Sequence, residues 1–151
     1  MKNLIIATAI AAIGVSCNDQ KTKEADVPAE VKTKFESMFP SAKVEKWEEE
    51  DGKYEAEFKK DNIINSVVFE ANGTYVQSES EIEISALPAG VNEYVTANLS
   101  GKKIEEATKI THDDGTIAYE TEIGDNDYLF DAKGGFISKE QEEKETEDDD
   151  K

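Results

Sequence analysis

The chain has 151 residues and carries 35 acidic side chains against 17 basic ones, which gives a formal charge of -18. This charge argues against binding to nucleic acids or to anionic lipid headgroups. The chain contains no Arg, so it also lacks the residue that recognises phosphates and guanine bases through paired hydrogen bonds.

The N-terminus has the pattern of an export signal. Lys2 precedes an apolar run over residues 4–15, which has signal-peptide length but is too short to span a bilayer. Small residues then precede Cys17, the single cysteine of the chain, as at a bacterial lipoprotein cleavage site. We therefore expect a lipoprotein signal peptide over residues 1–16 and a lipidated Cys17 as the sole membrane attachment. An ordinary signal peptide with an incidental cysteine is the alternative.

Polar stretches without apolar periodicity flank the central part of the chain. We expect residues 17–26 to form a tether. Residues 140–151 hold eight acidic side chains against two lysines, and such a block predicts a disordered tail. One folded domain is left for residues 27–139. A single cysteine excludes a disulfide within the monomer, so a hydrophobic core must stabilise this domain.

The first half of the domain, residues 27–84, begins with a predicted amphipathic helix that Pro28 can open and Pro40 must end. Its apolar residues recur with the spacing of one helix face, namely Val31, Phe35, Met38 and Phe39. The period then changes to two, as in a strand with one buried face, most clearly over residues 54–59. Turn residues at 51–52, 61–62 and 72–73 separate the predicted strands.

The second half, residues 87–139, repeats this order of events at an offset of roughly sixty residues. A helix opens at Pro88 and ends before Gly101, with Gly90 inside it as an unfavourable residue. Four strands follow, separated by turn residues at 114–115, 124–125 and 133–134. We therefore predict an α+β fold: two tandem repeats of a helix plus four antiparallel strands, which form one curved antiparallel sheet with the helices on one face.

Four segments carry a resemblance to a known family. They are the helix opening at 27–31, the stretch from Phe39 to Trp47, the strand at 54–58 and the turn at 69–73. Together they resemble the PepSY-like proteins, small secreted bacterial domains whose fold is similar to that of the β-lactamase inhibitory protein. The resemblance implies a curved sheet of two repeats. It also implies a binding or inhibitory role, because PepSY-type domains occur in protease pro-regions.

Catalytic and metal-binding signals are weak. His112 is the single histidine, and one His without a second His or a neighbouring Cys makes a poor zinc site. No serine lies in a nucleophile elbow, so we predict neither an enzyme nor a cofactor. The best cation hypothesis is a calcium site formed by Asp125, Asp127 and Asp131, although the spacing of a calcium-binding EF-hand loop is absent.

Aromatic side chains offer candidate anchors for a partner. A sheet with helices on one face leaves its other face open, and an aromatic side chain on that face could contact a partner. Tyr75 and Phe136 occupy matching places after turns of the two halves, and Trp47 lies nearby in the first half. A purely structural role in the core is the alternative for all three.

These patterns predict an exported, lipid-anchored, non-enzymatic module that binds a protein or peptide in the cell envelope, with a basic partner favoured by the acidic composition. Two alternatives remain open at this stage. One is an inhibitor of a peptidase or another enzyme, and the other is a protein that binds calcium or a small ligand.

Overall fold

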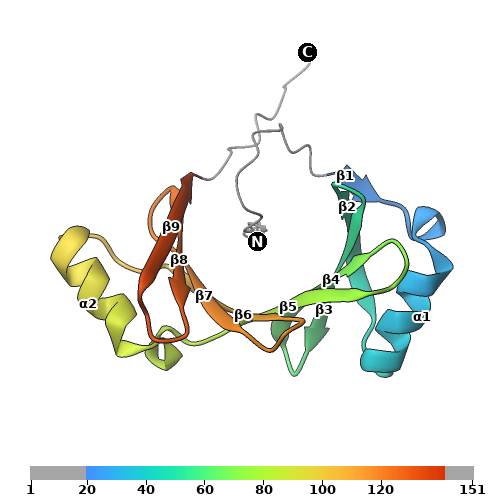
Figure 1. The fold of residues 1–151 in the computed structure, drawn as a ribbon, viewed down its shortest axis with the longest axis horizontal. Coiled ribbons are helices and arrows are strands. Elements are labelled where there is room, and N and C mark those ends of the chain that lie inside the picture. The colour runs from blue at the N-terminus through green and yellow to red at the C-terminus, as the bar shows by residue number, and fades with distance from the viewer. Residues whose placement is uncertain (1–19, 142–151) are drawn as a thin grey trace, which may run out of the picture.

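The computed structural model describes residues 20–141, and in them nine antiparallel strands form one sheet whose spatial order follows the chain from β1 to β9. Each hairpin places a strand beside its predecessor, so the sheet is a continuous meander. Figure 1 shows that the sheet is strongly curved and that helices α1 and α2 lie outside the curve, at its two ends. The predicted fold class, a curved antiparallel sheet with helices on one face, is confirmed.

The two predicted repeats are both present. The first contains α1 (Ala29–Met38), β2 (Val44–Glu50), β3 (Lys53–Lys60), β4 (Ile63–Glu70) and β5 (Tyr75–Glu81). The second contains α2 (Ala89–Asn98), β6 (Glu106–His112), β7 (Ile117–Glu122), β8 (Asn126–Asp131) and β9 (Phe136–Gln141). Strands β5 and β6 pair directly, which joins the repeats into one sheet.

The N-terminal boundary of the fold differs from the expected tether. Residues Gln20–Thr22 form β1, which pairs with β2, and Glu24–Asp26 form a 3-10 turn. An equivalent 3-10 turn, Ile84–Ala86, precedes α2. Polar composition suggested a loose segment, but backbone pairing with an edge strand does not require apolar side chains. At the other end β9 extends to Gln141, past the predicted start of the tail.

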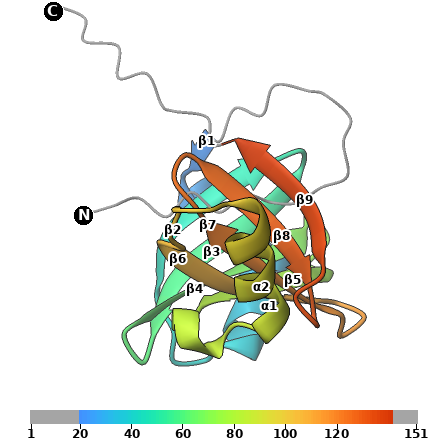
Figure 2. The ribbon, with the colours of Figure 1, turned by 90° about the vertical axis from the view of Figure 1, so that its left-hand side faces the viewer.

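Each helix packs its apolar stripe against the strands of its own repeat. Val31 and Phe35 of α1 are buried, and the Phe35 ring lies 5.2 Å from that of Phe58 on β3. In the second repeat Val91 and Val95 of α2 join a separate core cluster that includes Phe130 of β8. Figure 2, seen from the α2 side, shows α2 in front of the sheet. The protein therefore has two cores on one face of a shared sheet.

Two tight turns fit the residues that form them. Asp51 and Gly52 have φ values of 50° and 75°, and Asp61 and Asn62 have values of 55° and 65°. Positive φ at both central residues defines the two-residue turns that match the twist of a hairpin, and Asp, Asn and Gly tolerate this region best. These hairpins fix the register of β2, β3 and β4.

A close backbone contact explains why α2 contains Gly90, an unfavourable residue inside a helix. A Cβ atom at this residue would lie 2.7 Å from the carbonyl oxygen of Lys133 and 3.0 Å from that of Gly134. The missing side chain therefore lets the β8–β9 turn contact the first turn of α2. In the first repeat the turn residue Gly73 makes the matching approach, since a Cβ there would lie 2.8 Å from the Glu30 carbonyl oxygen.

We predict that Gly90→Ala destabilises the protein although Ala is the better helix former by about 1 kcal/mol. The clash is with backbone atoms, which cannot move without displacing the turn. Urea unfolding monitored by circular dichroism measures the effect, and Asn92→Ala, at an exposed position of the same helix, is the control. A Gly90→Ala variant as stable as the control would contradict this packing.

Candidate functional site

The concave face of the sheet is the face that neither helix covers (Figure 1). Side chains alternate between the two faces along each strand. Those that belong to the two core clusters point to the convex face, toward α1 and α2. The intervening residues therefore point to the concave face, and the strand register assigns them from β2 to β9.

Acidic side chains dominate the concave face. Every strand from β2 to β9 contributes at least one of them: Glu48, Glu50, Glu55, Glu57, Glu70, Glu79, Glu81, Glu106, Glu120, Glu122, Asp127 and Glu140. Lys46, Lys53 and Lys59 also lie on this face, and Lys46 forms an ion pair of 2.6 Å with Glu48. Carboxylates gathered on an inward-curving surface reinforce one another's field, so this face attracts cations.

Glu79 lies at the centre of this face, on the fifth of the nine strands. Only 3% of its surface is exposed. One carboxyl oxygen accepts a hydrogen bond of 2.7 Å from the Gln77 amide, whereas the other, Oε2, is buried without a hydrogen-bond partner. Ser66, opposite Glu79 on β4, also has a buried oxygen without a partner, and apolar Ile110 is opposite on β6. Glu79 is therefore held in one orientation by Gln77, but two buried oxygen atoms at this site lack hydrogen-bond partners.

Burial raises the pKa of Glu79 to about 8, with a further contribution from the negative charge of Glu55, while the Gln77 hydrogen bond acts in the opposite direction. Desolvation likewise raises the pKa of Glu57 on the same face. Glu79 is therefore mostly uncharged at neutral pH, although its neighbours at the rim of the face are exposed to solvent to varying degrees.

Sequence reasoning missed Glu79 because its strand has the ordinary alternation of a solvated surface. Its repeat equivalent is Glu140, which lies opposite Asp127 just as Glu79 lies opposite Ser66. Glu140 is exposed, since β9 is an edge strand, whereas β5 has neighbours on both sides. The signal that could have found Glu79 is its place in the middle strand of a curved sheet, combined with the repeat alignment.

The three candidate aromatic residues do not lie on the open face, and their placement agrees with the alternative of a structural role in the core. Trp47 is 6% exposed and packs edge-on against Phe35 of α1 at 5.9 Å. Tyr75 packs against the same core, and its hydroxyl donates a hydrogen bond of 2.7 Å to the Thr111 carbonyl. Phe136 stacks on Tyr94 of α2 at 4.7 Å. All three therefore belong to the helix-covered face.

A β-bulge in each repeat explains this placement. Val68 pairs with Gln77 but Phe69 pairs with Tyr75, so β5 holds one extra residue between them. The matching shift in β8 and β9 places Phe136 opposite Phe130. An extra residue turns the next side chain to the other face. Phe136 still has 42% of its surface exposed, so its contact with a partner stays a prediction.

The predicted calcium ligands do not converge. Asp125 precedes β8 and Asp131 is its last residue, while Asp127 is 7% exposed. Asp131 closes the following turn, where the amides of Gly135 and Lys133 donate to its carboxylate and lower its pKa. Within residues 20–141 no group of three or more His, Cys, Asp or Glu side chains is placed to hold a metal ion. The hypothesis of a calcium site therefore gains no support from the described residues.

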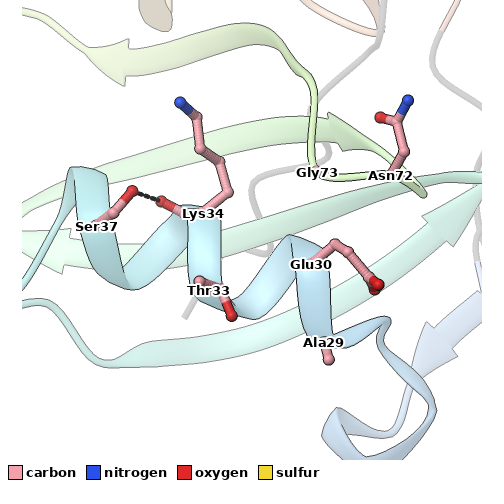
Figure 3. Close-up of a pocket in the computed structure, with 7 residues that line it drawn as sticks. All are labelled: Ala29, Glu30, Thr33, Lys34, Ser37, Asn72 and Gly73. Atoms are coloured by element: carbon pink, nitrogen blue, oxygen red, sulfur yellow. Dashed lines mark hydrogen bonds between the residues drawn. The ribbon is translucent and has the colours of Figure 1, made fainter.

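His112 and a depression beside α1 are two other candidate sites, and neither has the groups of a binding or catalytic site. His112 lies at the end of β6 opposite Gln77 and is partly exposed, without the ligands of a metal site. A shallow depression lies between α1 and the β4–β5 turn (Figure 3). Its lining is polar and mostly exposed, and Ser37 there donates a hydrogen bond of 2.7 Å to the Lys34 carbonyl. Neither place has a buried group that awaits a partner.

The N-terminal predictions lie outside the described residues. These are the signal peptide, the lipidated Cys17 and the first residues of the tether, and the acidic tail after Gln141 is likewise not described. Among residues 20–141 no helix has the length and apolar character needed to cross a membrane.

Comparison with solved structures supports the fold. A DUF2874 family protein from Bacteroides uniformis superimposes with a TM-score of 0.67 at 21% identity, over 76% of this chain and 88% of that one. A Bacteroides eggerthii protein, provisionally described as periplasmic, gives 0.67 at 19% identity over 76% and 88%. A BLIP-like protein from Bacteroides fragilis gives 0.59 at 20% identity over 79% and 91%. At these identities the likeness concerns the fold alone.

A search of the curated proteins found no match. The family model described as beta-lactamase-inhibitor-like and PepSY-like matches two segments, residues 13–65 and 53–138. The two matches overlap over residues 53–65 and together span most of the chain. They confirm the family resemblance drawn from the helix openings, strands and turns. The chain therefore belongs to this PepSY-like family.

Proposed function

We propose that this protein is an exported, non-enzymatic binding module whose acidic concave face receives a basic segment of a protein or peptide in the cell envelope. The observation that carries the proposal is the row of carboxylates on the one sheet face that no helix covers. Complementary charge steers a basic partner to such a face and fixes its orientation. The helices, at the other face, leave this surface open along the described strands.

The location rests on two supports. The apolar run before Cys17 has the pattern of a lipoprotein signal, and the Bacteroides eggerthii protein of similar fold is provisionally described as periplasmic. A lipid on Cys17 would tether the domain at a membrane surface while the sheet stays free to bind.

Glutamates on the two sides of the sheet supply a matched test of the binding face. Glu50 on β2 and Glu106 on β6 point to the concave face, whereas Glu49 on β2 points the other way and Glu93 is exposed on α2, outside the curve. The double variants Glu50→Lys/Glu106→Lys and Glu49→Lys/Glu93→Lys therefore change the net charge equally, on opposite sides of the sheet. Immobilised protein of each kind is exposed to an envelope extract, and retained proteins are identified by mass spectrometry.

We expect a basic protein that the natural sequence and the Glu49→Lys/Glu93→Lys variant retain and that the Glu50→Lys/Glu106→Lys variant loses. Equal loss with both variants would mean that overall charge, and not the concave face, governs binding. Equal retention by both would exclude the acidic face as the binding surface.

An inhibitor is the second candidate, and the family description as beta-lactamase-inhibitor-like favours it. An inhibitor would bind an enzyme and reduce its turnover at a one-to-one ratio. If the retained protein is an enzyme, we measure its activity with the natural sequence and with the Glu50→Lys/Glu106→Lys variant. Inhibition by the first and not by the second supports this candidate, and unchanged activity with both removes it.

A further inference from the structure

The centre of the concave face differs from its rim, because Glu79 combines burial with an unused hydrogen-bonding atom. A buried polar atom without a partner destabilises the folded state, because it has lost its hydrogen bonds to water. Oε2 of Glu79 and the hydroxyl of Ser66, which face each other across β4 and β5, are both in this condition. Gln77 already holds the other carboxyl oxygen in place, at 2.7 Å. The carboxyl group is thus oriented, and its second oxygen is unpaired but buried, so a donor reaches it only when the side chains around it move aside.

The surroundings decide which donor fits. Neutral neighbours on the adjacent strands are Ser66, Val68 and Ile110. The titratable side chains that share the face around Glu79 are Glu55, Glu57 and Lys59 on β3, Glu81 on β5 and His112 on β6. Three of these five groups are acidic and Lys59 is paired with Glu45 at 3.2 Å, so the site favours a cation over an anion. An arginine guanidinium suits such a site, because it is weakly hydrated and carries several donors in a fixed plane.

We propose that Glu79 is the point at which the concave face receives an arginine of the basic partner, and that Glu79 gives up its proton to solvent as the arginine arrives. This inference rests on the proposed function. Before binding, the carboxyl group is neutral and holds its proton. Afterwards it is a carboxylate paired with the guanidinium, which keeps all of its own protons, so one proton is released for each partner bound. A pair of charges in a desolvated site attracts strongly and repays part of its desolvation cost.

The proposal makes binding depend on pH in a defined direction. Burial keeps Glu79 protonated in the free protein up to about pH 8, while the partner's cation favours the ionised form. Affinity should therefore rise with pH by up to about tenfold per unit and level off above the pKa of free Glu79. Arginine stays charged throughout this range, so the partner does not contribute to the change.

The test uses the purified full chain and a short peptide of alternating Arg and Ser with blocked ends. Isothermal titration calorimetry in two buffers with different ionisation enthalpies gives the number of protons released. At about pH 7 we expect nearly one proton per peptide from the natural sequence. The Glu79→Gln variant should release almost none and bind with a flat pH profile. The Glu140→Gln and His112→Gln variants, which change other groups of the same face, should still release about one proton per peptide, whatever their effect on affinity.

Two results overturn this inference in distinguishable ways. If the peptide binds without proton release, or if Glu79→Gln still releases the proton, Glu79 is not the receiving group. The proposed function then stands, provided that Glu50→Lys/Glu106→Lys still abolishes binding. If the peptide binds the natural sequence and this double variant equally, or binds neither, the concave face is not a basic-segment site and both proposals fail.

Discussion

Above about pH 8 we expect the Glu79→Gln variant to be more stable than the natural sequence, by roughly 2 to 5 kcal/mol in the free energy of unfolding. The natural side chain is 3% exposed and must carry a charge there once the pH exceeds its pKa. Glutamine keeps the shape and stays neutral, so the variant avoids the cost of an ionised carboxylate in a buried place.

The direction follows from proton linkage. The pKa of Glu79 is about 8 in the folded protein, against an ordinary value of 4.5 in the unfolded chain. Between these values the folded state holds a proton that the unfolded state has lost, so stability falls as the pH rises. The slope from this one group is about 1.4 kcal/mol per pH unit. Below pH 4.5 Glu79 is neutral in both the folded and the unfolded state, so Glu79→Gln should hardly change the free energy of unfolding there.

Urea unfolding at a series of pH values measures this difference, with Glu140→Gln as the control. Glu140 has the same residue type at the same repeat position but is exposed, so its substitution should leave the slope unchanged. Equal pH profiles for Glu79→Gln and the natural sequence would show that Glu79 is ionised in the folded state at ordinary cost. The gain in stability from Glu79→Gln should coincide with the loss of proton-coupled binding proposed above.

Phe130→Ala should cost about 3 to 5 kcal/mol of unfolding free energy. The Phe130 ring is fully buried between α2 and the sheet and lies 5.5 Å from Tyr94 and 6.1 Å from Phe136. Its removal leaves a cavity at the centre of the second core, which no neighbouring element can fill without moving α2. Since small domains have only about 5 to 15 kcal/mol of stability, this variant should be close to unfolding.

The natural control is Ile137→Ala, because Ile137 is the extra residue in the β9 bulge and is 54% exposed. It should change stability by less than about 0.5 kcal/mol. If Phe130→Ala does not fold, Phe130→Leu gives a smaller effect of the same sign. A loss below about 1 kcal/mol for Phe130→Ala would contradict the described core.

The repeats, the helices and the hairpins could be predicted from sequence because local chemistry dictates them. Pro28 and Pro88 open the helices, and residues such as Asp51 and Asp61 adopt the positive φ that their hairpins need. These signals are repeated in both halves, so each half supports the interpretation of the other.

The residues of the concave face were harder to predict, because β-bulges and the position of a strand within the sheet cannot be read from the alternation of polar and apolar residues. The bulges beside Val76 and Ile137 reverse the side on which Tyr75 and Phe136 point. Likewise, a carboxylate on an alternating strand gives no sign of burial. Glu79 is buried because β5 is central in a nine-stranded sheet, a property of the assembled fold and not of the segment.

The most direct test of the acidic concave face is to observe its carboxylates during binding. In the full chain labelled with 13C at glutamate carboxyl carbons, we would titrate the Arg-Ser peptide and follow each resonance by NMR. We expect shifts for Glu50 and Glu106 on the concave face and none for Glu49 and Glu93 on the convex side. Equal shifts for all four, or shifts confined to the convex pair, would contradict it.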